Sequence, residues 1–267
     1  MAEITAALVK ELREMTGLGM MECKKALMEA GGELHRAEAL LRIKSGAKAS
    51  KAAGRIAAEG VIGAWISGDA QFGALVELNC ETDFVARNED FLAFAGTLAE
   101  IAAKDEAGLA SPELEQKRQR LVQKIGENIS IRRSRRLQAK GKLALYLHGA
   151  KIGALVDYEG AEDLGRDLAM HVSFYRPQFL SRTEVPAEVI AQERKIHQAR
   201  AKQSGKPAEI AARMVDGSMK KFLGEITLLG QPFVKDDKQA VEKVLAARKG
   251  RVLGFAFLVV GEGIARH

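Results

Sequence analysis

The side chains that most often carry chemistry are scattered along this sequence of 267 residues. Its five histidines have no helically spaced cysteine, histidine or carboxylate partners that would build a metal-ligand set, and Cys23 and Cys80 are far apart. We predict that both cysteines are small buried hydrophobes and that His171, near an apolar helix face, is a satisfied core residue. His148 stands beside Gly149 at a predicted hairpin tip, where a contact role and a plain turn role fit equally well.

Motifs for nucleotide binding and hydrolysis are missing as well. The segment QSGKP, residues 203–207, lacks the earlier glycine of a phosphate-binding loop and places Pro207 where that loop needs a hydroxyl. H-E-x-x-H and G-x-S-x-G segments do not occur, and no G-x-G-x-x-G opens a helix after a strand. We therefore predict a protein that is not an enzyme, has no cofactor or metal of its own, and does not bind nucleotide directly.

The segment NCETDFVARNEDF, residues 79–91, carries a different signal. It follows an apolar alternation and precedes a predicted helix, so its aromatic residue Phe84 falls in a turn between Asp83 and Arg87. Asn88 is placed to cap the helix, because its side chain can accept hydrogen bonds from the first free backbone N–H groups. A ring in such a turn either packs into the chain's own core or contacts a partner, and the residues alone leave both open.

Charge is unevenly distributed behind a net value of +6. Residues 56–116 hold 12 acidic and 2 basic side chains, whereas residues 117–142 hold 10 basic and 1 acidic. The run IRRSRRLQAK, residues 131–140, clusters arginines as a phosphate-binding surface does. No aromatic residue interleaves with that run, so it offers bases no stacking platform. We favour a solvated or protein-contacting face and disfavour nucleic-acid binding.

The elements that must position these residues begin with a helical module. Apolar residues recur at helical spacing in three segments within residues 1–45, which the breakers at 16–19 and 31–32 separate. A unit this small buries little surface and suits recognition better than catalysis. Residues 44–60 are rich in alanine, glycine and lysine, which predicts a linker or a solvated helix.

The apolar period then changes to that of strands. Two alternating runs flank the polar turn at residues 68–71 as a β-hairpin, and an amphipathic helix follows. Residues 143–160 predict a second hairpin, which matches the first through four identical residues, 73–76 and 153–156, and again precedes a helix. This favours a duplication. A last strand, residues 252–260, is apolar on both faces and is predicted to be buried.

Residues 185–222 have a narrow apolar stripe that SGKP interrupts, which is typical of two antiparallel helices projecting from a core. The predicted fold class is α+β: a small N-terminal three-helix module, then a duplicated hairpin-plus-helix core with an inserted antiparallel helical hairpin. We expect the module and linker at 1–55, the core subdomains at 56–140 and 141–267, and the insertion at about 186–222. No apolar run reaches the roughly 18 residues that a membrane span needs. We therefore expect a soluble cytoplasmic protein.

Seven segments follow one another in a characteristic order: LVKELREMTGLGMMECKKAL, NCETDFVA, KIGENISIRR, LHGAKIGAL, MHVSF, SGKP and GQPFV. In this order they closely resemble bacterial elongation factor Ts, and the resemblance covers nearly the whole chain. It implies that the helical module is ubiquitin-associated-like. It also implies a guanine-nucleotide exchange factor that acts on the GTPase elongation factor Tu during translation elongation, with a dimer of heterodimers as one possible assembly.

The resemblance implies roles for individual residues. The exchange element corresponds to Thr82, Asp83, Phe84 and Val85. Phe84 would insert between helices of the GTPase near its bound Mg²⁺ and displace the elements that hold the ion and the β-phosphate. Further contacts with the GTPase correspond to Lys24, Ile125, Gly126 and His148. The residues alone describe Lys24 as a solvated lysine, and Ile125 fits a core position equally well.

Two alternatives remain open. A basic ribosome- or RNA-associated protein would use Arg132, Arg133, Arg135 and Arg136 and bind less tightly at higher salt. A scaffold would bind the GTPase without exchange.

Two departures from the family pattern also affect the expected interface. The sequence stops at GEGIARH, where many relatives continue into a C-terminal helix that packs on the partner, so we expect part of the usual interface to be missing. Glu81 stands where many relatives have glutamine, and we expect its charge to weaken or redirect a local contact.

Overall fold

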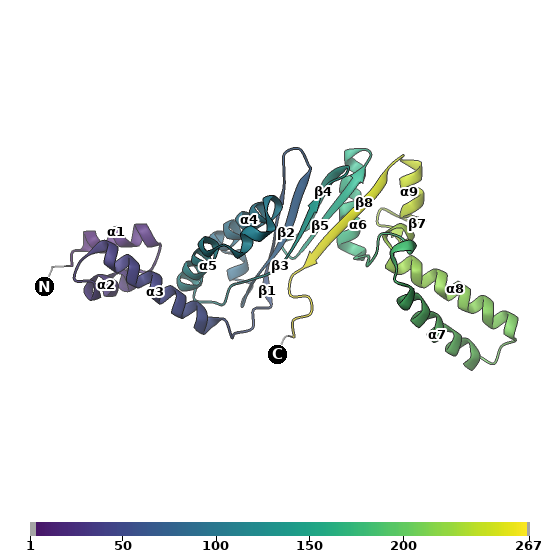
Figure 1. Ribbon diagram of the computed structural model, residues 1–267, viewed down its shortest axis with the longest axis horizontal. Helices are drawn as coiled ribbons and strands as arrows, with labels where there is room; N and C mark the ends of the chain where they lie inside the picture. Colours follow the sequence, from purple (N-terminus) through teal and green to yellow (C-terminus); the bar gives the residue numbers. More distant parts are fainter. Residues whose placement is uncertain (1–3, 266–267) are drawn as a thin grey trace.

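The computed structural model describes residues 4–265 and has the mixture of helices and antiparallel sheets expected of an α+β fold (Figure 1). The α-helices are α1 (Ala6–Thr16), α2 (Met20–Glu29), α3 (Leu34–Ala52), α4 (Glu89–Lys104), α5 (Pro112–Ile125), α6 (Glu162–Tyr175), α7 (Ala187–Gln203), α8 (Ala208–Ile226) and α9 (Val241–Ala247). The strands are β1 (Glu59–Ile66), β2 (Phe72–Cys80), β3 (Ser130–Gln138), β4 (Lys142–His148), β5 (Ile152–Glu159), β6 (Pro232–Phe233), β7 (Asp236–Ala240) and β8 (Arg251–Val259). Short 3-10 helices include η1 (Val85–Arg87) and η2 (Glu106–Ala110).

The N-terminal helices begin and end at residues that the sequence marks. Thr5 caps α1 by accepting a hydrogen bond from the N–H of Leu8, and Gly17 ends that helix with a φ of +69°. Helix α3 then continues to Ala52, so the helical alternative for residues 44–60 is correct as far as that residue. The prediction that this helix is fully solvated was wrong, because Ala49 and Ala52 are buried in the same core as residues of α4 and α5.

Two three-stranded antiparallel sheets form the centre of the molecule, ordered β1-β2-β3 and β4-β5-β8. The second hairpin and its helix form where the repeated segment predicts them. In both sheets the central strand pairs out of register at the same aligned place, between Glu77 and Leu78 and between Asp157 and Tyr158. A shared irregularity at aligned positions supports the duplication beyond the four identical residues.

The two sheets pack against each other, and helices cover their outer faces (Figure 1). Leu75 and Leu155 occupy equivalent positions in the two repeats, and both lie in the cluster between the sheets with Leu258. On the far side of the first sheet, the stripe of α4 that includes Phe91 and Leu98 packs beside residues of α5. Helices α6 and α9 cover the second sheet in the same way. The core therefore consists of one layer between the sheets and one beneath each set of helices.

Strand β8 corrects one expectation. It is an edge strand of the second sheet and most of its residues are only half-buried, although Ala256 and Leu258 are buried. A strand that is apolar on both faces is buried only if other elements cover both faces. The faces of β8 are only partly covered.

The helical hairpin of α7 and α8 projects from the core at the end opposite the N-terminal helices (Figure 1). Its helices are held by a small cluster centred on Ala201, Val215 and Met219, which explains the narrow stripe. We propose the three units at 1–55, 56–140 and 141–267 as domains, since each boundary falls between elements. Within residues 4–265, no helix has the length and apolar character to cross a membrane.

Candidate functional site

The turn of residues 81–84 joins β2 to η1 and presents Phe84 to solvent. The side chain of Phe84 is 80% exposed, whereas Val85 packs against the first core and Ala86 is buried. Asp83, in the same turn, pairs with Arg87, with 3.0 Å between Asp83 Oδ2 and Arg87 Nη2. The ring of Phe84 therefore does not pack into the chain's own core, which was one of the two alternatives.

Hydrogen bonds hold the backbone that carries this ring. One carboxylate oxygen of Glu127 accepts from the N–H groups of Glu81 and Thr82, each at 3.0 Å, and the other accepts from the Thr82 hydroxyl at 2.6 Å. The Thr82 hydroxyl accepts in turn from the N–H of Val85 at 3.4 Å. The Cys80 thiol donates to the Thr82 carbonyl at 3.1 Å. Burial and the nearby Glu127 raise the pKa of Cys80 to about 12, so the thiol stays protonated and keeps donating.

Three segments that are distant in sequence meet beside the turn. Arg55 Nε lies 3.2 Å from Glu81 Oε1, and Arg55 Nη2 donates to the carbonyl of Gly126 at 2.9 Å. Asn128 donates its backbone N–H to the Glu81 carboxylate and its side-chain N–H to the carbonyl of Arg55 at 2.7 Å. The charge of Glu81 is thus engaged within the chain, by Arg55 and Asn128.

Sequence reasoning did not single out Glu127, although a signal was present. Glu127 is the one acidic residue among the 11 charged residues of 117–142. It directly follows Gly126, whose φ of +88° ends α5 in the left-handed region that glycine tolerates best. The chain turns there toward β3, and this turn brings the Glu127 carboxylate to the end of β2.

Ile125 and Gly126, two further predicted contact residues, belong to this same corner. Ile125 is half-buried against the first core, so its core alternative holds in part, and Gly126 is exposed. Both precede Glu127, the residue whose carboxylate holds the turn that carries Phe84.

His148 lies exposed at the end of β4, as expected for a hairpin tip. The following strand begins beside the first sheet, where Lys151 Nζ pairs with Glu59 Oε2 at 2.5 Å. Glu59 is the strand partner of Cys80, the last residue before the turn that carries Phe84. The hairpin tip and the turn therefore lie at the same end of the core.

Lys24 lies on the exposed surface of α2, in the N-terminal module. Met20 and Met21 on the same helix are exposed rather than part of the module's core. Glu22 accepts a hydrogen bond from Gln123 at 2.9 Å, which ties α2 to the helix that ends at Gly126. Helix α3 is tied to α2 as well, by the pair of Lys48 with Glu22, and no direct contact between Lys24 and the turn that carries Phe84 is part of the described structure.

His171 is a buried core residue, as predicted. Its Nδ1 accepts from the N–H of Val234 at 3.1 Å, so Nε2 carries the proton and donates to Gln231 Oε1 at 3.0 Å. Burial lowers the pKa of His171 to about 4, which keeps the ring neutral. Cys23 and Cys80 are both buried and free, as predicted.

His197 has a carboxylate partner one turn earlier on α7, with 3.1 Å between His197 Nε2 and Glu193 Oε1. This pair stands alone: within residues 4–265 there is no cluster of three or more His, Cys, Asp or Glu side chains that could hold a metal ion. His267 lies outside the described residues.

The arginines of the basic run lie on β3 and are largely engaged by the chain itself. Arg132 and Arg133 both pair with the buried carboxylate of Glu77. Arg136 donates from Nε to a backbone carbonyl of α4, and its guanidinium lies 5.4 Å from the ring centroid of Phe72. These contacts leave only part of the run free to meet phosphates.

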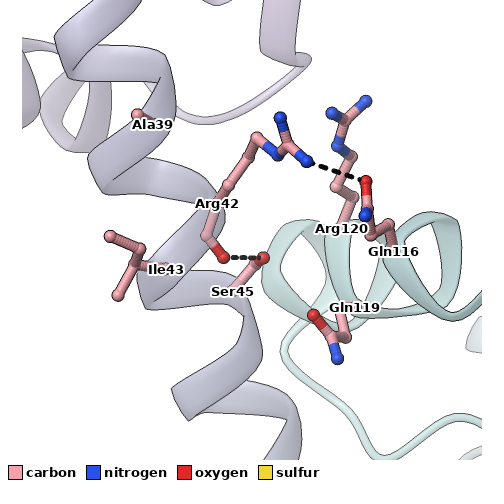
Figure 2. A pocket seen from close by; sticks show the side chains of 7 residues that line it. All are labelled: Ala39, Arg42, Ile43, Ser45, Gln116, Gln119 and Arg120. Atoms are coloured by element: carbon pink, nitrogen blue, oxygen red, sulfur yellow. Dashed lines mark hydrogen bonds between the residues drawn. The ribbon is translucent and has the colours of Figure 1, made fainter. Parts of the chain in front are cut away.

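A groove between α3 and α5 is a separate surface feature. Figure 2 shows Arg42 and Arg120 on its two walls, with Arg42 Nη2 donating to Gln116 Oε1 at 2.9 Å. Ile43 is exposed beside it. None of the candidate site residues lines this groove, so it does not contribute to the site described above.

The candidate residues thus occupy an exposed turn, an exposed helix surface and a hairpin tip. The class that fold and geometry define is an α+β protein whose candidate residues lie largely on its surface.

Comparison with known proteins is more specific. The sequence model described as Elongation factor TS matches residues 81–262. The chain is 56% identical over 277 residues to Elongation factor Ts of Nitrosomonas eutropha, covering all of this chain and 94% of the relative. It is 58% identical over 280 residues to that of Nitrosospira multiformis, covering all of this chain and 93% of the relative. The chain belongs to the elongation factor Ts family, whose members serve translation elongation.

Proposed function

We propose that this protein is a guanine-nucleotide exchange factor for elongation factor Tu, and that it acts on this partner GTPase in the cytoplasm without being an enzyme itself. The observation that carries the proposal is the exposed ring of Phe84 on a turn that Glu127 fixes to the core. Membership of the elongation factor Ts family supports the identity of the partner.

In the proposed mechanism the ring acts as a wedge. GDP is held in a GTPase largely by the phosphate-binding loop and Mg²⁺. If Phe84 inserts between helices near the ion, it raises the free energy of the nucleotide-bound state without touching the base. An acceleration of about 10⁴-fold requires the barrier to fall by about 5.5 kcal/mol. A buried aromatic anchor with its neighbours supplies contributions of that size.

The other candidate residues fit as supporting contacts. We assign Thr82, Asp83 and Val85 to the exchange element with Phe84. Contacts farther along the interface are assigned to Lys24, Ile125, Gly126 and His148. Coupling between the two ligands of the GTPase is then reciprocal, so GDP must weaken binding of this protein by the factor by which this protein weakens GDP.

Stopped-flow release of a fluorescent GDP analogue from the cognate elongation factor Tu tests the proposal. We expect a large acceleration by the wild-type protein and loss of most of it in Phe84→Ala. Ile43→Ala is the matched control, since it removes an exposed apolar side chain from a groove that contains no candidate residue. An absence of acceleration at saturating wild-type protein would refute the exchange function.

The same experiment separates the alternatives. A scaffold would bind the GTPase and leave the GDP release rate unchanged. An RNA-associated protein would bind RNA with an affinity that falls steeply with salt, and substitution of Arg135 would reduce the salt slope. Sedimentation of the complex then distinguishes a heterodimer from a dimer of heterodimers.

A further inference from the structure

Glu127 is the residue through which the exchange turn is attached to the rest of the core. Its two carboxylate oxygens accept three hydrogen bonds from the turn, two from backbone N–H groups and one from the Thr82 hydroxyl. The two backbone donors belong to Glu81 and Thr82, which immediately precede Asp83 and Phe84. A carboxylate used in this way fixes the direction in which the chain leaves β2.

The attachment is reciprocal. Glu81, on the turn, accepts a hydrogen bond from the backbone N–H of Asn128, which follows Glu127. Each segment thus accepts a backbone N–H of the other with a glutamate carboxylate. Glu81 and Glu127 are 46 positions apart, and Glu81 and Asn128 are 47 apart. This paired arrangement opposes rotation of the turn as well as its separation from the core.

We propose that Glu127 is a positioning residue for nucleotide exchange, which holds the 81–84 turn so that Phe84 is already directed outward before the partner arrives. The inference rests on the proposed exchange function. Its physical basis is preorganisation: a turn that is ordered in the free protein loses less conformational freedom when its ring enters the partner. Glu127 acts through Phe84, and direct contact with the GTPase is not required of it.

The substitutions Glu127→Ala and Glu127→Gln test whether the hydrogen bonds of Glu127 position the turn. The Ala variant removes both acceptor oxygens and with them all three hydrogen bonds. The Gln variant keeps a carbonyl oxygen for the two backbone N–H groups, and its amide can donate to the Thr82 hydroxyl, which is able to accept. We expect Ala to lower the maximal GDP release rate about tenfold, because the turn that carries Phe84 is then less ordered before binding. We expect Gln to restore most of that rate.

Asp157→Asn is the matched control. The Asp157 carboxylate also accepts two backbone N–H groups, those of Lys140 and Gly141, at 2.9 and 3.0 Å. Lys140 and Gly141 follow the far end of β3. Ser130, at the start of β3, pairs with Asn79 near the turn, whereas Gln138, at its end, pairs with Phe72. The control therefore weakens a similar brace far from Phe84, and we expect it to leave the maximal release rate unchanged.

Two measurements test whether Glu127 acts through the ring. In the Phe84→Ala background, Glu127→Ala should lower the residual rate by no more than about twofold, because the two changes affect one unit. In the free protein, hydrogen exchange of the Glu81 and Thr82 amides, followed by NMR, should accelerate at least about tenfold in Glu127→Ala and remain slow in Asp157→Asn.

The outcomes are distinct. Unchanged amide exchange, a wild-type release rate in Glu127→Ala, or a full additional loss in the double variant would each overturn the positioning role. If the wild-type protein itself does not accelerate GDP release, the proposed function fails, while the amide measurement still reports whether Glu127 holds the turn.

Discussion

The backbone N–H of Gly261 donates to the carboxylate of Glu77 at 2.7 Å, although 184 positions separate the two residues. Glu77 lies in the middle of β2 and is fully buried, and Gly261 follows β8 of the second sheet. Arg132, Arg133 and the side-chain amide of Asn79 donate to the same carboxylate. Burial raises the pKa of Glu77, but these hydrogen bonds outweigh it and hold the pKa below its usual value. Glu77 thus joins the two halves of the core.

Replacement of Glu77 by alanine should strongly destabilise the fold. Without the carboxylate, two partly buried arginines and a backbone N–H lose their partner, and breaking such a pair costs about 3–5 kcal/mol. Urea unfolding followed by circular dichroism measures the loss. Glu100→Ala, which breaks the exposed pair with Lys104, serves as the control and should cost less than about 1 kcal/mol. Similar losses in the two variants would contradict this account of Glu77.

The stability of the protein should fall on acidification because of His171. The pKa of His171 is lowered to about 4 in the fold by burial, from an ordinary value of 6.5. Its contribution is fully present above pH 6.5, where the ring is neutral in both states, and is lost as the pH falls from 6.5 to about 4. The loss approaches about 3 kcal/mol.

Unfolding free energies measured at intervals between pH 7 and pH 4 test this dependence. His171→Asn should flatten the slope in that window, and His35→Asn, at an exposed position, should keep it. An equally steep slope in His171→Asn would show that other groups cause the acid sensitivity.

Phe84 and Phe91 should respond in opposite ways to truncation. Phe84 is exposed and Phe91, in the first turn of α4, is completely buried, although only seven positions separate them. Phe91→Ala leaves a cavity and should cost about 3–5 kcal/mol. Phe84→Ala should change the stability by less than about 0.5 kcal/mol. Thermal unfolding of both variants is the measurement, and a large loss in Phe84→Ala would mean that its ring packs within the free protein.

At Gly63, β1 packs closely against the backbone of α4. A Cβ atom at Gly63 would lie 2.2 Å from the backbone carbonyl oxygen of Ala95, so helix and strand would have to separate. We expect Gly63→Ala to cost at least about 1–3 kcal/mol, as overpacking does. At Gly68 in the hairpin turn, a Cβ would meet nothing within 4 Å, and Gly68→Ala should be nearly neutral. Equal melting temperatures for the two variants would contradict this close packing.

Much of the fold followed from signals that act over a few residues. Asn88 caps α4 and the polar turn at 68–71 closes the first hairpin, each where the sequence predicts. The exposed edge of β8 and the buried face of α3 could not be predicted, because apolar periodicity does not say which neighbour covers a face.

The sequence by itself determined the three N-terminal helices, the helix after each β-hairpin, the projecting helical hairpin and the two β-hairpins, since caps, turns and periodicity depend on neighbouring residues. It also placed Phe84 in a turn, without deciding which way the ring faces. Only the tertiary structure decided that the ring is exposed, that Glu127 reaches Thr82, and that the basic run of β3 pairs with Glu77. Those contacts join residues 45 to 55 positions apart, where the packing of sheets and helices sets the distance and local preference has no influence.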